Sequence, residues 1–277
     1  MFFKEHPVTG DQYINPDGKA PLKVRTKSGC LIELYRYSDP DRKSLARSAA
    51  LYLGKADTDN IKRPLQIMAN DHTLEIFRGE SADFIFYMTP KQVYDHLVTY
   101  KTCNMRVAGG NRALISKSYT APVDRMKDPQ RVEEELQVAM DRYWRLAETE
   151  TPQVARSIMP VNADMEPFRL QFNFQTLIQA LFPQRIFDLG AQGLTVEVVQ
   201  GMWNLVYVVD PELWGQVYEL YGPHAKDWKM AQRKLRKAGT SVGEFVSKVT
   251  ELDGFHWEMS LETAIRLMYG KRKNMWG

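Results

Sequence analysis

Residues 84–113 read FIFYMTPKQVYDHLVTYKTCNMRVAGGNRA and place a strand, a helix and a glycine loop next to one another along the chain. The opening residues continue the alternating run ADFIFYM, which is typical of a half-buried β-strand. Pro90 fits the first turn of a helix whose apolar face carries Val93 and Leu97. We expect this helix to continue through KTCN into the Gly-Gly loop. A strand joined directly to a helix predicts a fold that mixes α and β elements.

The residues before this stretch predict two further strands and a helix. CLIELYRYS at 30–38 has the composition of a strand, and the helix after it is expected to begin at Asp39 or Asp41 and to stop at Gly54. HTLEIFRGESADFIFYM at 72–88 contains two β-rich runs around RGES. A strand, a helix and a pair of strands therefore precede residue 90, and the second strand of that pair is the run ADFIFYM described above.

The second half of the chain is predicted to be largely helical. Residues 128–149 have apolar side chains at helical spacing, and we expect two more helices at about 166–182 and 191–209. The composition changes after Asp210, where Trp, Lys and Gly become frequent. We therefore expect an N-terminal arm or short hairpin at 1–28, a main domain at 29–210 and a mostly helical accessory region at 211–277.

Composition excludes several classes of protein. The 277 residues carry 37 basic and 34 acidic side chains, and this net charge of +3 makes nucleic acid an unlikely partner. The two cysteines, Cys30 and Cys103, have no ligand spacing, so we expect neither a disulfide framework nor a metal site. No apolar run approaches the ~20 residues of a membrane span, and we expect an intracellular protein.

Three segments resemble the flavin-dependent thymidylate synthases. CLIELYRYSDPDRKSLARSAALY is similar to the opening strand, turn and first helix of that family, and the 84–113 segment occupies the place of its signature motif. The most specific likeness is ARSIMPVN, followed by FRLQFNFQTLIQALFPQR and AQGLTVEV. The resemblance implies an α+β fold in which an antiparallel sheet packs with helices. It also implies a homotetramer whose sites are shared between subunits.

The resemblance implies roles for individual residues. Arg156 stands at the family's nucleotide-contacting arginine, and Asn173 and Gln179 stand at positions that contact the flavin. Either Gln184 or Arg185 meets the arginine that grips the pyrimidine ring, and the choice between them is open. An arginine there stabilises the charge that develops on the ring, whereas a glutamine amide also matches cytosine.

The family's signature, R-H-R-x-x-S-x-N-E-x-S-x-R, is altered in this chain. Two arginine or histidine charges are lost, because threonine and tyrosine cannot form the forked ionic bonds of arginine. Either the ligand or its binding mode has changed. The matched positions are His96 for a glutamine, Thr99, Tyr100 and Lys101 for R-H-R, Asn104 and Gly109 for the serines, and Asn111 or Arg112 for the last arginine.

Other residues are candidates for binding. The segment AGGNR at 108–112 offers close backbone approach and a forked cation to a nucleotide phosphate, or it is a plain loop. His96 is a possible flavin contact or base, with structural burial as the alternative. Cys103 follows Lys101 closely, which favours a thiolate, although a lone cysteine is usually a core residue. The candidates are Gly109, Gly110, Asn111, Arg112 and His96 for substrate, and Ser38, His72, Thr99, Tyr100 and Lys101 for cofactor.

The leading hypothesis is an enzyme that modifies C5 of dUMP or dCMP by methylation, hydroxymethylation or hydroxylation, such as a phage uses to make non-standard bases. The resemblance implies FAD, and leaves open folate (methylenetetrahydrofolate) and NADPH. The alternative is a catalytically inactive homologue that binds nucleotide or a partner protein. A third hypothesis, nucleic-acid binding, rests on the basic stretch at 229–239, which more often forms a solvated helix face.

Overall fold

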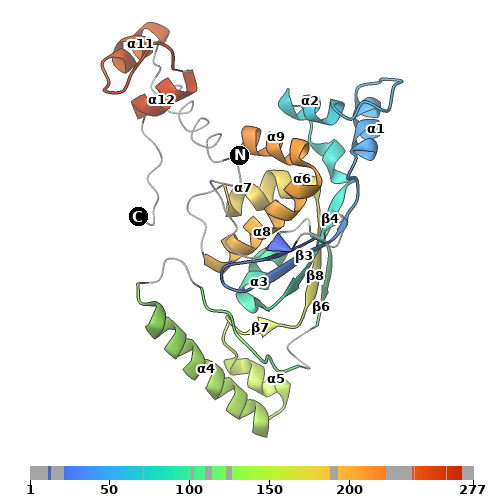
Figure 1. Ribbon diagram of the computed structural model, residues 1–277, viewed down its shortest axis with the longest axis vertical. Helices are drawn as coiled ribbons and strands as arrows, with labels where there is room; N and C mark the ends of the chain where they lie inside the picture. The colour runs from blue at the N-terminus through green and yellow to red at the C-terminus, as the bar shows by residue number, and fades with distance from the viewer. Residues whose placement is uncertain are drawn as a thin grey trace.

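An antiparallel sheet forms the centre of the computed structural model, which describes residues 12–13, 22–70, 72–100, 103–109, 114–122, 127–187, 193–222, 239, 241–259 and 261–269. Six strands pair in the order β1-β2-β3-β4-β8-β6, and every pair is antiparallel. Helices cover one face of this sheet (Figure 1), which confirms the predicted α+β class. The strands are β1 (Gln12–Tyr13), β2 (Leu22–Arg25), β3 (Leu31–Tyr37), β4 (Ser81–Tyr87), β6 (Cys103–Ala108) and β8 (Phe168–Asn173).

Alternating side chains explain the two central strands. Phe84 and Phe86 of β4 are fully buried, as are Leu170 and Phe172 of β8. Phe86 pairs with Phe168 in register, and their rings stack with centroids 4.9 Å apart. Because every second residue points to the helices, both strands bury a continuous apolar row.

Two predicted helices are partly strands. Residues 168–173 were expected to begin a helix, but their period-two pattern places them in β8, and the helix starts at Phe174 after its cap, Asn173. Residues 103–108 were expected to prolong the preceding helix, which instead ends at Val98, and they pair with β8 as an edge strand. Pairing with a distant strand outweighs local helix propensity at both places. The first β-rich run at 72–88 is likewise a short 3₁₀ helix, η2 (Glu75–Arg78).

The helices of the main body have the expected positions. The sequence correctly places α1 (Lys43–Tyr52), α8 (Gly193–Val209) and α4 (Pro129–Thr149). Asp39 accepts hydrogen bonds from the backbone N–H groups of Ser44 and Leu45, so it holds the start of α1. The other segments are α2 (Arg63–Ala69), β5 (Thr89–Pro90), α3 (Lys91–Val98), α5 (Pro152–Ala155), η3 (Arg156–Ile158), β7 (Asp164–Met165), α6 (Phe174–Thr176), η4 (Leu177–Leu181) and α7 (Phe182–Arg185).

Helix α8 crosses the sheet at close range. A Cβ atom on Gly201 would lie 3.0 Å from Ile32 Cδ1 and 3.0 Å from Val24 Cγ1. The glycine therefore allows the helix to approach β2 and β3. Since Val24 is buried in β2, part of the segment expected as an arm at 1–28 belongs to the sheet.

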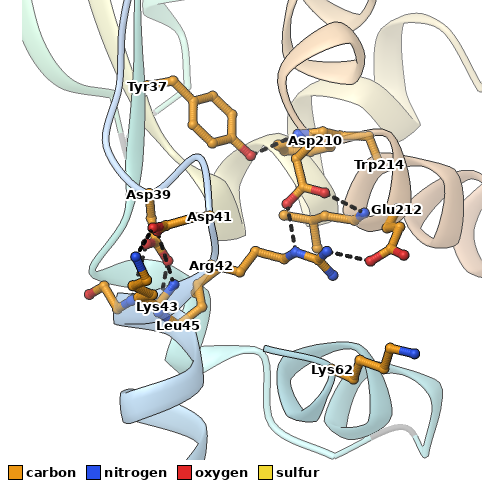
Figure 2. A network of polar contacts seen from close by, with 12 residues as sticks. Tyr37, Asp39, Asp41, Arg42, Lys43, Leu45, Lys62, Asp210, Glu212 and Trp214 are labelled. Carbon is orange, nitrogen blue, oxygen red and sulfur yellow. Dashed lines mark hydrogen bonds and ion pairs between the residues drawn. The ribbon is translucent and has the colours of Figure 1, made fainter. Parts of the chain in front are cut away.

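Helix α9 (Pro211–Tyr221) also belongs to the main core, although we expected it in the accessory region. Leu213, Trp214 and Val217 are fully buried in that core. Figure 2 shows how the start of α9 is fixed: the buried Arg42 reaches between Asp210 and Glu212, and its Nε lies 3.1 Å from Asp210 Oδ2. A buried cation held by two carboxylates ties α9 to the start of α1.

Two smaller clusters lie outside the main core. Helices α4 and α5 share one that includes Met140, Tyr143 and Ala155, and Figure 1 shows them at one end of the sheet. Helices α11 (Val242–Thr250) and α12 (Leu261–Tyr269) form another around Phe245 and Ile265. In the described residues, no helix is both long and apolar enough to cross a membrane.

Candidate functional site

Four polar residues meet where α3, α7 and α8 pack together, and we call them the His96 cluster: His96, Tyr100, Arg185 and Thr195. His96 lies in the last turn of α3, and Tyr100 follows just after the helix ends at Val98. His96 Nδ1 lies 2.7 Å from Oγ1 of Thr195, in the first turn of α8. Arg185 Nε, at the end of α7, donates a hydrogen bond of 2.9 Å to the Tyr100 hydroxyl.

The sequence nominated three of these residues separately, and the structure brings them together. His96 and Tyr100 came from the altered signature motif, and Arg185 came from the FPQR segment. Gln184, the alternative to Arg185, is exposed and makes no hydrogen bond to the cluster among the described residues. Arg185 is therefore the member of that pair that reaches the cluster. Thr195 was missed, because a threonine in a first helical turn has no sequence signal of its own.

The charges of the cluster follow from burial and from Arg185. Burial lowers the pKa of His96, and the positive charge of Arg185 lowers it further, while Asp95 opposes both effects. Burial raises the pKa of Tyr100, an effect that Arg185 opposes. At neutral pH the cluster therefore contains a neutral imidazole, a neutral phenol and one guanidinium. Such a set can hold an anionic or carbonyl oxygen while excluding a cation.

The nucleotide-contact candidate Arg156 lies in another part of the fold. It is half-buried in η3, directly after α5, and this segment packs against α4 rather than against α7. Figure 1 shows α5 and α7 at different ends of the sheet. Within one chain, Arg156 and Arg185 therefore do not share a site.

Two candidate cofactor residues are committed to the fold. The Asn173 side chain accepts a hydrogen bond of 2.8 Å from the Thr176 N–H and is only 5% exposed. Ser38 donates to Glu80 and accepts from the backbone N–H of Ser81 at 2.9 Å, which fastens the end of β3 to β4. Both residues lie at the same end of the sheet, because Ser81 also pairs with Asn173. The hydrogen bonds that these two polar side chains make within the fold are a sufficient explanation for their presence.

The remaining cofactor and substrate candidates are exposed or lie outside the described residues. His72 and Gln179 are exposed, and Thr99, also exposed, donates its hydroxyl to the His96 carbonyl oxygen at 2.7 Å. Gly109 is exposed after β6. Lys101, Gly110, Asn111 and Arg112 lie outside the described residues, so the expected phosphate loop is described only as far as Gly109.

In the described residues, neither cysteine is shown to be a reactive nucleophile. Cys30 is fully buried, and burial raises the pKa of its thiol to about 12, so the thiol stays protonated. Cys103 lies in β6, and the position of its side chain is not among the described features. Among the described residues, no three potential ligands gather closely enough to hold a metal ion.

Comparison with known proteins identifies a related fold. The chain resembles the crystal structure of a UMP/dUMP methylase, PolB from Streptomyces cacaoi, bound with 5-Br dUMP, with a TM-score of 0.54. The two share 18% sequence identity, and the match covers 72% of this chain and 98% of the other. No protein-family model and no curated protein matches the sequence. At this identity the likeness establishes a shared fold.

Proposed function

We propose that this protein binds a pyrimidine nucleotide at the His96 cluster and modifies C5 of its base. The observation that carries the proposal is the contact between Arg185 and Tyr100, two residues nominated by different motifs. The fold supports it, because a solved chain with a similar fold is a UMP/dUMP methylase bound with 5-Br dUMP. The substrate class we propose is dUMP or dCMP, and the reaction is methylation, hydroxymethylation or hydroxylation.

Arg185 is the residue that would polarise the base. Its Nε is engaged with Tyr100, which leaves the Nη groups to face a ring oxygen and the adjacent nitrogen. Negative charge grows on these ring atoms when C5 becomes nucleophilic, and a fixed guanidinium stabilises that charge more than it stabilises the ground state. Tyr100 is only 7% exposed, so it holds the guanidinium in one orientation.

Binding tests the proposal directly. The melting temperature of the purified chain should rise with dUMP or dCMP and not with dAMP, because a ligand that binds only the folded state stabilises it. Arg185→Gln should abolish the shift, whereas Gln184→Ala, at the exposed neighbouring position, should preserve it. Absence of a shift with every pyrimidine nucleotide would contradict the proposal. Binding without turnover would instead favour the inactive homologue.

We also propose FAD as the redox cofactor, on the strength of the sequence resemblance. A bound reduced flavin supplies a hydride. Of the four candidates outside the altered motif, Ser38 and Asn173 are engaged in the fold, and only His72 and Gln179 are free to contact it. None of these four residues belongs to the His96 cluster. Titration with FAD, followed by its visible absorption and fluorescence quenching, tests this proposal separately.

Arg156 leads to a proposal about assembly. Arg156 and the His96 cluster lie at different ends of the sheet (Figure 1). A site that uses both Arg156 and Arg185 therefore needs two copies of the chain. We propose a closed homo-oligomer in which Arg156 of one copy contacts the nucleotide held by Arg185 of another. Light scattering coupled to size-exclusion chromatography measures the oligomeric state.

A further inference from the structure

The Thr195 hydroxyl fixes which nitrogen of His96 carries a proton. Thr195 is 1% exposed, and its Oγ1 lies 2.7 Å from His96 Nδ1. Within the described part of the chain, the hydroxyl has no other hydrogen-bond partner. A buried O–H group without an acceptor costs more than an unfilled oxygen lone pair. The hydroxyl therefore donates to Nδ1, and the proton of the neutral imidazole resides on Nε2.

The neighbouring charges favour this neutral form. Arg185, from α7, lowers the pKa of His96 in addition to the effect of burial. Asp95, the adjacent acidic side chain on α3, acts in the opposite direction, but it is paired with Lys91. Tyr100 remains a neutral phenol. Protonation of Nδ1 would also make the Thr195 oxygen the acceptor and leave its O–H without a partner among the described residues, which adds a further penalty.

We propose that Thr195 is a positioning residue that makes His96 a neutral hydrogen-bond donor, with its Nε2–H directed outward to a nucleotide oxygen. This inference rests on the proposed nucleotide site. His96 is an exposed residue, and in the described part of the chain only its Nδ1 has a hydrogen-bond partner, which leaves Nε2 for a ligand. A phosphate or base carbonyl oxygen accepts from such a donor, whereas a group that must lose a proton to His96 finds no free lone pair. His96 therefore recognises substrate rather than acting as a base.

Nitrogen-detected NMR of histidine-labelled protein tests the assignment without any ligand. At pH 8 the His96 signal, identified by its loss in His96→Gln, should show the Nε2–H tautomer, and its titration midpoint should lie below the ordinary histidine value of about 6.5. Thr195→Val, which keeps the shape and removes the donor, should raise that midpoint. Thr195→Ser should leave it unchanged. An Nδ1–H tautomer in the wild type, or an unchanged midpoint in Thr195→Val, overturns the inference.

Measurements of nucleotide affinity distinguish a failure of this inference from a failure of the proposed function. Calorimetry with dUMP should give about threefold to tenfold weaker affinity for Thr195→Val than for Thr195→Ser, because one oriented hydrogen bond is lost. If the wild-type protein binds neither dUMP nor dCMP, the proposed function fails, while the NMR result still decides the tautomer. If nucleotide binds equally to both variants, Thr195 does not position His96 for recognition.

Discussion

Arg185 Nε donates a 2.9 Å hydrogen bond to the Tyr100 hydroxyl, although the two residues are 85 positions apart in the sequence. The guanidinium also lies beside the Tyr100 ring, with its Cζ atom 5.8 Å from the ring centroid. A flat cation held by a contact over a ring and by a hydrogen bond has a defined direction, which is what recognition of a planar base requires.

Removal of the Tyr100 hydroxyl should therefore affect binding more than stability. In Tyr100→Phe the charge of Arg185 remains but its orientation is lost, and we expect the affinity for dUMP to fall about threefold to tenfold. Tyr94→Phe is the matched control, because Tyr94 packs edge-on against Phe168 and its hydroxyl has no hydrogen-bond partner among the described residues. Equal dUMP affinities of the two variants, measured by calorimetry, would show that the hydroxyl contact is not used.

The crossing of α8 over the sheet gives a stability prediction. Gly201→Ala places a methyl group 3.0 Å from both Ile32 and Val24, and such overpacking should lower the free energy of unfolding by about 1–3 kcal/mol. Gly215→Ala in α9 is the control, since its nearest neighbour, the Tyr207 ring, is at an ordinary 3.9 Å. The control should be neutral or gain about 0.5–1 kcal/mol from helix propensity. Urea denaturation of both variants measures the difference, and equal stabilities would contradict the close approach.

The position of α9 predicts where the chain can be shortened. A chain that stops after Gly222 keeps the buried Leu213, Trp214 and Val217, so its main body should fold. A chain that stops after Asp210 loses all three, at about 1.5–3 kcal/mol each, which is comparable with the whole stability of a domain. Circular dichroism and thermal melting compare the two. Similar cooperative transitions in both would place α9 outside the folding unit.

The sequence predicted those helices and strands whose hydrophobic periodicity is visible in their own residues. The alternation of β4 and the helical spacing of α4 and α8 were sufficient, because these patterns lie within the residues of each element. The strands β6 and β8 were misassigned, since they exist through pairing with each other and with β4. Their backbone partners are distant in sequence, and the short alternation of β8 did not by itself separate a strand from the start of a helix.

In the candidate site, too, contacts between residues distant in sequence could not be predicted. Arg185, His96 and Tyr100 could be nominated by the motif positions they occupy, but their contact depends on how α7 packs beside α3 and α8. The bond from Thr195 to His96 spans 99 positions, and only the packed structure reveals it. Asn173 and Ser38 were nominated on the same grounds, yet the structure uses their polar groups to cap a helix and to join two strands.

The separation of Arg156 from Arg185 leads to the last prediction, which concerns shared sites. Arg156→Ala and Arg185→Gln should each lose dUMP binding as pure oligomers, because every site lacks one of its two cations. When the two variants are unfolded together and refolded as a mixture, sites that combine Arg156 from one copy with Arg185 from another should recover binding. The refolded wild type and each refolded single variant are the controls. A mixture that binds no more dUMP than the single variants would place both arginines in the same copy, or remove Arg156 from the site.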